Sequence, residues 1–216
     1  IIENELENQK NQALSLALMF SRNQEIIKSL ENKNNIELKK ELLKLLNIIE
    51  TYTKNSIDMQ IHTKDLEVFT RSWEDKDFGL KLDSFREGLV KVKNQKEPYV
   101  SSELGKRFNI KAIAPIYNDK NIFIGSLEVI VDFKSLVNRL KTLGIDSIVM
   151  LEKDYLHIAT YHQNNQKFKD YAILESSFTK GLLDILEKNP QFLKKDKFYY
   201  ELDNRIFTQI PLGEFE

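Results

Sequence analysis

The chain has 216 residues, of which 41% are hydrophobic and 30% are charged, and its formal net charge is −1. This composition predicts folded domains and argues against disorder, and the near-zero charge argues against a nucleic-acid-binding protein. The sequence has no cysteine, which excludes disulfides, thiol nucleophiles and cysteine-bound metals. No apolar run approaches the roughly 18 residues of a membrane-spanning helix, and the seven glycines form no nucleotide-binding loop.

The first 55 residues contain neither Pro nor Gly and are predicted to be helical. One row of apolar residues recurs at seven-residue spacing, at Leu6, Ala13, Phe20 and Ile27. A second row, with two polar members, starts three positions later, at Gln9, Leu16, Asn23 and Leu30. This seam has two interpretations: an amphipathic helix lying on its own domain, or a helix shared with a second copy of the chain.

Two interruptions of the helical region are expected. Asn23 is a good N-cap with Glu25 in the following turn, although Ile26 leaves the capping box incomplete. The second interruption is expected within residues 32–35, ahead of a helix over residues 36–51. The chain begins without Met or a signal peptide, which predicts a fragment of a longer protein.

From residue 57 the periodicity becomes that of β-strands. Polar residues alternate with the apolar residues Ile57, Met59 and Ile61. Residues 66–73 are rich in β-branched and aromatic side chains, so the two stretches predict a hairpin.

A helix is expected over residues 82–94, with an apolar face made by Leu82, Phe85, Leu89 and Val92. Pro98 stops it. Strands over residues 110–117 and 122–133 follow, joined by a turn-forming stretch. This order of elements predicts an antiparallel sheet with helices on one face, an α+β fold.

The second half repeats the order of hairpin, helix and hairpin less completely. A helix over residues 135–143, ended by Gly144, comes first. The later elements are expected to be strands 145–151 and 155–161, a polar loop 162–172, a helix 178–186, and a final hairpin of strands 198–202 and 205–212 across Asp203 and Asn204.

Several segments resemble the Cache family of extracytoplasmic sensor domains. They are IHTKDLEVFTR (61–71), FGLKLDSFR (78–86), ELG (103–105), IAPIY (113–117) and IGSLEVIVDF (124–133). The likeness covers most of residues 1–136 and is strongest for the double-Cache subgroup, in which a second PAS-like module follows. Residues 145–216 match that module only loosely, and its last strand is expected beyond Glu216. The motif of the amino-acid-binding subgroup is incomplete, because only Arg71 and Trp73 match it.

The resemblance implies a helical region over residues 1–56, a PAS-like Cache module over 57–136 and a smaller PAS-like module over 137–216. It implies a periplasmic or extracellular part of an inner-membrane chemoreceptor, histidine kinase or cyclic-dinucleotide enzyme, anchored by flanking membrane helices and dimeric through the N-terminal helix. A small molecule bound in the cup of the sheet would shift the long helix or the membrane-proximal module.

Two arginines are the main candidates for ligand binding. Arg71 shares a strand face with Phe69 and Trp73, and Arg86 belongs to the next segment of the resemblance. A guanidinium binds a carboxylate or phosphate through two parallel hydrogen bonds, so an anionic or zwitterionic ligand is expected. The alternative is that each arginine pairs with an internal or nearby carboxylate, with Asp75, Asp77 and Asp83 close in sequence and Glu128 also available.

Four further residues complete the predicted site. Lys111 and Tyr117 share a face of their strand, and Glu128 lies on the next strand, so Tyr117 and Glu128 could orient an amine or hydroxyl. Glu128 could equally be an internal counter-ion of a buried cation. Trp73, the only tryptophan, either stacks on the ligand or fills the core.

Neither catalysis, a metal site nor a cofactor is expected. His157 and His162 are five residues apart and do not share a face, and Ser101 has no nucleophile-elbow glycines. We therefore predict a small-molecule sensor without enzymatic activity. The alternative is a ligand-free dimerisation module that senses a partner protein.

Overall fold

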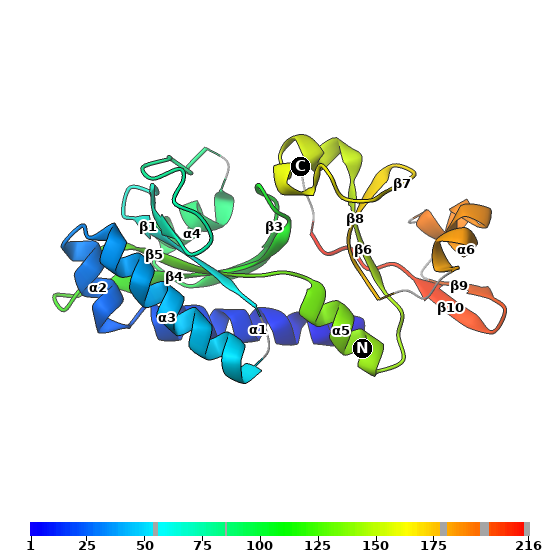
Figure 1. Ribbon diagram of the computed structural model, residues 1–216, viewed down its shortest axis with the longest axis horizontal. Coiled ribbons are helices and arrows are strands. Elements are labelled where there is room, and N and C mark those ends of the chain that lie inside the picture. The colour runs from blue at the N-terminus through cyan, green and yellow to red at the C-terminus, as the bar shows by residue number, and fades with distance from the viewer. Residues whose placement is uncertain (54–55, 85, 178–180, 195–198, 214–216) are drawn as a thin grey trace. The chain divides into compact units, whose positions relative to one another are not determined.

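The computed structural model describes residues 1–53, 56–84, 86–177, 181–194 and 199–213 (Figure 1). These residues form two compact units. One consists of residues 7–132, and the other of residues 1–6 together with 133–216. Each unit has its own sheet, and we describe each by itself.

Three helices precede the first sheet: α1 (Ile2–Phe20), α2 (Gln24–Glu31) and α3 (Asn35–Thr53). Both predicted interruptions are present. The side-chain oxygen of Asn23 accepts hydrogen bonds from the backbone N–H of Glu25 (2.9 Å) and Ile26 (3.1 Å), so the cap forms without a capping box. The oxygen of Asn34 accepts a similar bond from the N–H of Glu37 (3.1 Å).

The first row of the predicted seam is buried within the single chain, whereas Gln9, Leu16 and Asn23 of the second row are half-buried. Relative exposures are 5% or less for Leu6, Ala13, Phe20 and Ile27. The interpretation of a helix lying on its own domain therefore describes these four side chains, and they are not available to a second copy of the chain.

The first sheet has five strands in the order β2-β1-β5-β4-β3, and every neighbouring pair is antiparallel. The strands are β1 (Asp58–Thr63), β2 (Val68–Arg71), β3 (Tyr99–Glu103), β4 (Asn109–Tyr117) and β5 (Phe123–Val131). The α+β fold with a long N-terminal helix is as predicted. Figure 1 shows α1 to α3 on one side of this sheet and α4 (Glu87–Gln95) on the other, so the prediction of helices on one face only was wrong.

Two further predictions about this unit were wrong. β3 was not predicted, because Tyr99–Glu103 is polar and becomes a strand by pairing with β4. Helix α4 begins at Glu87 and not at Leu82, because Leu82 donates its backbone N–H to Leu66 and so belongs to the loop beside β2. Phe85 of the predicted helix face lies outside the described residues.

The two faces of the first sheet differ in polarity. Side chains alternate across a strand, and the face toward the N-terminal helices is apolar, with Met59, Ile61, Ala112, Ala114, Leu127 and Val129 all buried. Gly125 belongs to this face, where a Cβ atom would lie 2.2 Å from the carbonyl oxygen of His62 and 2.9 Å from Leu30 of α2. The face toward α4 carries buried polar residues.

The second unit contains α5 (Lys134–Thr142) and a separate three-stranded sheet in the order β6-β8-β7. The strands are β6 (Ile148–Glu152), β7 (Lys167–Phe168) and β8 (Tyr171–Ser176). The prediction of a strand over residues 155–161 was wrong. That stretch forms short 3-10 turns (Lys153–His157 and Thr160–His162), in which the N–H groups of Ile158 and Ala159 bond back to the carbonyl of Tyr155.

The predicted polar loop over residues 162–172 was also partly wrong, because β7 and the start of β8 lie in it. A helix, α6 (Leu182–Lys188), a 3-10 turn (Pro190–Leu193) and the hairpin of β9 (Tyr199–Leu202) and β10 (Arg205–Thr208) complete the unit. The hairpin turns as predicted at Asp203 and Asn204, both of which have positive φ. Residues 178–180 of the predicted helix and residue 198 of the predicted hairpin lie outside the described residues.

Candidate functional site

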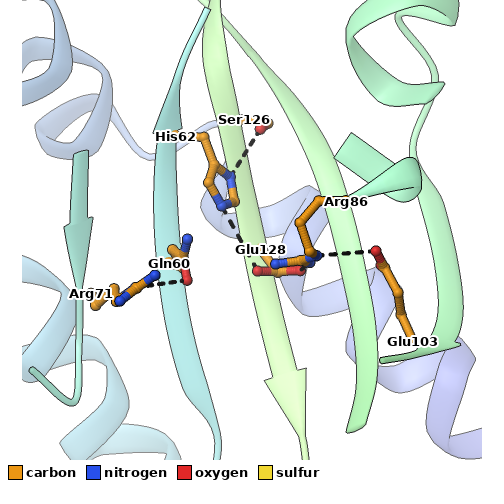
Figure 2. A network of polar contacts seen from close by, with 7 residues as sticks. All are labelled: Gln60, His62, Arg71, Arg86, Glu103, Ser126 and Glu128. Carbon is orange, nitrogen blue, oxygen red and sulfur yellow. Dashed lines mark hydrogen bonds and ion pairs between the residues drawn. The ribbon is translucent and has the colours of Figure 1, made fainter. Parts of the chain in front are cut away.

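The polar face of the first sheet gathers buried polar side chains from all five strands and from Arg86, just before α4; Figure 2 shows most of them. Strand pairing sets Gln60 of β1 between Arg71 of β2 and Glu128 of β5, and sets His62 opposite Ser126. We call the following set the sheet-face cluster: Gln60, His62, Arg71, Arg86, Glu103, Lys111, Ser126 and Glu128.

Arg86, which immediately precedes α4, joins two strands of the sheet through two carboxylates. Its Nε donates to Oε1 of Glu103 on β3 (3.0 Å), and its Nη2 donates to Oε1 of Glu128 on β5. Burial acts to lower the pKa of Arg86, but Glu128 and Glu103 outweigh it and hold that pKa above its ordinary value. Arg86 is therefore a fixed cation whose charge is shared between two acidic side chains.

Arg71, the other predicted anion anchor, is also paired. Its Nε donates to Oε1 of Gln60 (3.2 Å), and its Nη1 donates to Glu74 (2.6 Å) and Asp77 (2.5 Å). Hydrogen bonds from Lys106 and then Arg71 lower the pKa of Asp77. For both arginines the structure therefore contains the carboxylate pairs of the alternative interpretation.

His62 is fully buried beside Glu128. Its Nδ1 lies 3.2 Å from the hydroxyl oxygen of Ser126, and its Nε2 lies 3.8 Å from Oε2 of Glu128. Burial, followed by repulsion from Arg86 and Arg71, lowers the pKa of His62 well below its ordinary value. The imidazole is consequently neutral at pH 7, and its separation from Glu128 is too long for a hydrogen bond.

Lys111 lies on the same face of β4, opposite Ser101 of β3. It is 4% exposed. Burial, followed by repulsion from Arg86, lowers the pKa of Lys111 to about 7, although Glu128 and Glu103 act in the opposite direction. The side chain therefore changes its protonation within the physiological pH range.

Several buried atoms of the described residues have no hydrogen-bond partner within the chain. In the sheet-face cluster these are Gln60 Nε2, His62 Nε2, Glu103 Oε2 and Glu128 Oε2, and Ser101 Oγ and Asn109 Oδ1 lie on the same face of the sheet. Buried polar atoms are almost always paired in folded proteins, so a group of unpaired donors and acceptors is what a polar ligand can satisfy.

The structure brings together four of the six predicted ligand-binding residues: Arg71, Arg86, Lys111 and Glu128. Tyr117 lies apart at the end of β4, where its hydroxyl donates to the carbonyl of Lys96 (3.1 Å). Trp73 follows β2, is half-buried and is contacted by the guanidinium groups of Arg71 and Arg107, at 5.5 and 4.8 Å from the ring centroid.

Gln60 and Ser126 were not among the predicted site residues, and Glu103 and His62 were not assigned to the site. The alternation in β1 already separates Gln60 and His62 from Met59 and Ile61, but it does not show that the polar face is covered. Neither a group of potential metal ligands nor a helix apolar and long enough to cross a membrane occurs in the parts of the chain that the structure describes.

Comparison with known proteins adds the following findings. The model of a family described as the double sensory domain of two-component sensor kinases, dCache_3, matches residues 1–188. A domain of a putative sensory box/GGDEF family protein from Vibrio parahaemolyticus is 13% identical, with a TM-score of 0.51 over 88% of this chain and 73% of that chain. The sensor domain of the V. cholerae histidine kinase DctB is 10% identical, with a TM-score of 0.51 over 70% and 59%.

At these identities the solved structures show a shared fold alone. A search of curated proteins gave no match.

Proposed function

We propose, from the premise that the chain belongs to the dCache_3 family of double sensory domains, that it senses a small molecule on the polar face of its five-stranded sheet. The observation that carries the proposal is the set of unpaired buried atoms in the sheet-face cluster. These atoms include both donors and acceptors, and they lie on the neighbouring strands β1 and β5 and on β3, which β4 separates from β5. The matched structure from the V. cholerae histidine kinase DctB is a sensor domain, which supports a role in sensing without enzymatic activity.

The ligand is a small charged molecule, and a zwitterion fits better than a simple anion. Both arginines expected to bind an anion already contact carboxylates of the chain. A zwitterion brings an ammonium group for the acidic side chains as well as an anionic end. Arg86, Arg71, Lys111 and Glu128 would line the bound molecule.

The proposal extends to the whole receptor. Residues 57–136 and 137–216 are two PAS-like modules outside the cytoplasm, in the periplasm or at the cell surface, and membrane helices flank them in the complete protein. Ligand binding shifts α4 or the N-terminal helices against the sheet and so transmits a signal across the membrane. Because the first row of the seam of α1 and α2 is buried, a homodimer would use other surfaces of the N-terminal helices, and sedimentation at increasing protein concentration tests for it.

A thermal-shift screen of small carboxylates, amino acids, amines and purines tests the sensor function. A ligand that binds only the folded chain raises the melting temperature. Glu128→Gln, which changes a side chain that lines the bound molecule, should reduce the shift for a ligand held by the sheet-face cluster. If no compound raises the melting temperature, and the chain self-associates or captures one defined partner protein, the result would instead support a ligand-free interaction module.

A further inference from the structure

The charges of the sheet-face cluster and its surroundings do not favour an anion. Arg71 pairs with Glu74 and Asp77, Arg86 pairs with Glu103 and Glu128, Lys106 shares Asp77, and Arg107 pairs with Asp58. Lys111 is the further cation, and its burial disfavours its charged form. With Lys111 uncharged, these four paired cations face five carboxylates, so the named groups carry one net negative charge and give an anionic ligand no unpaired cation.

The unpaired oxygens define which chemical group would be bound. Oε1 of Glu103 and Oε1 of Glu128 both accept hydrogen bonds from Arg86, while Oε2 of each residue is buried and has no partner. An ionised carboxylate can only accept hydrogen bonds. A second carboxylate brought to these oxygens would be repelled, and a hydroxyl offers a single donor without charge.

We propose that the sheet-face cluster binds the ammonium group of a small primary amine, with Oε2 of Glu128 as its acceptor and the charge of Glu103 as a second attraction. An ammonium offers three donors and a positive charge, so it satisfies the unpaired oxygen of Glu128. The inference rests on the proposed sensor function and names the ligand class of that same site.

Gln60 extends the recognition beyond the ammonium. Its Oε1 accepts from Arg71, which directs its amide nitrogen elsewhere, and that buried nitrogen has no partner. Gln60 also lies directly opposite Glu128 in the pairing of β1 and β5. A second polar group of the amine, with an acceptor atom, would be bound by this donor.

Calorimetric titration of the whole 216-residue chain tests the ligand class with four four-carbon probes that differ in charge. The probes are the doubly charged amine butane-1,4-diamine, the singly charged amine butylamine, the neutral butane-1,4-diol and the dianion butanedioate. We expect the amines to bind, and the diol and butanedioate to bind at least about tenfold more weakly, because they lack the charge-assisted contact.

Glu128→Gln removes the charge of the acceptor with almost no change of shape, and it should weaken amine binding about 10- to 150-fold. Asp58→Asn is the matched control. Asp58 lies on the same face of β1 and pairs with Arg107 (2.6 Å), so its loss breaks an ion pair without touching Glu128 or Glu103. It should leave amine affinity within about twofold of the parent. If Glu128→Gln does not fold by circular dichroism, Glu103→Gln replaces it, with an expected loss of about tenfold.

Each result distinguishes the amine inference from the sensor function. Binding of butanedioate without binding of the amines would overturn the inference and uphold a small-molecule sensor. Amine binding that persists unchanged in folded Glu128→Gln or Glu103→Gln would also overturn it. Absence of binding by all four probes overturns the inference, and the broad thermal-shift screen then decides the sensor function separately.

Discussion

The five-stranded sheet and the three-stranded sheet bury their residues differently. In the first, β2 and most of β4 and β5 are buried on both faces, since the N-terminal helices pack on one side and α4 on the other. In the second, β6 alternates buried Val149 and Leu151 with half-buried residues. A charged side chain can be buried only on a face that is covered, and it persists there only where partners meet it. The candidate site lies on the covered polar face of the first sheet, so covering and not strand composition sets its place.

The largest expected effect comes from breaking the buried pairs of the first sheet. Arg86→Ala leaves Glu128 without its cation at a position with no exposure to solvent. We expect the free energy of unfolding to fall by about 3–5 kcal/mol. Urea denaturation followed by circular dichroism measures the change. A loss below about 1 kcal/mol would show that leaving Glu128 buried without its cation costs no more than breaking an exposed ion pair.

The two sheets should also differ in the free energy of unfolding that each loses when one leucine is replaced by alanine. Leu127 of β5 is fully buried, whereas Leu174 of β8 is half-buried. Leu127→Ala should cost about 2–5 kcal/mol, and Leu174→Ala about 1 kcal/mol. Equal losses in urea denaturation would contradict the difference in covering between the two sheets.

Lys111 should make stability depend on pH. Its pKa is about 7 in the folded chain and 10.5 in the unfolded chain, so between these values the unfolded state carries a proton that the folded state lacks. The free energy of unfolding should therefore rise with pH above 7, by about 1.4 kcal/mol per pH unit from this residue. Lys111→Met should remove that contribution, and identical slopes for parent and variant between pH 7 and 9 would exclude it.

Amine binding should follow the same titration. A protonated Lys111 repels a bound ammonium, so the affinity for butylamine should increase as pH rises from 6 to 8. The charged groups that act on Lys111 are Arg86 before α4, Glu103 of β3, Arg107 before β4 and Glu128 of β5. Calorimetry across this range measures the effect, and Lys111→Met should flatten it. An affinity that falls with rising pH would contradict this account.

The smallest effect is expected on the solvated helix surface. Lys40 and Glu37 of α3 form a pair whose side chains are both more than half exposed. Lys40→Ala should change the free energy of unfolding by less than about 0.5 kcal/mol. A change as large as that of Arg86→Ala would show that burial does not rank the ion pairs of this chain.

Local chemistry determined much of this fold from the sequence by itself. Asn23 bonds its own following turn, and Asp203 and Asn204 adopt the positive φ angles of a tight hairpin turn. Period-two alternation and β-branched composition were enough for the hairpin of β1 and β2, and the segments carrying the Cache resemblance were enough for the family. These features depend on residues a few positions apart, so their signal is contained within a short stretch of sequence.

Only the tertiary structure decided the rest, because it depends on what lies across from each residue. Tyr155–Tyr161 has the composition of a strand, yet its backbone bonds within itself and β6 pairs with β8 instead. Polar Tyr99–Glu103 becomes a strand because β4 offers it an edge. Arg86 meets Glu103 and Glu128 from 17 and 42 residues away. Burial and charge pairing at such separations, which set the chemistry of the sheet-face cluster, depend on how the strands align and not on any local pattern.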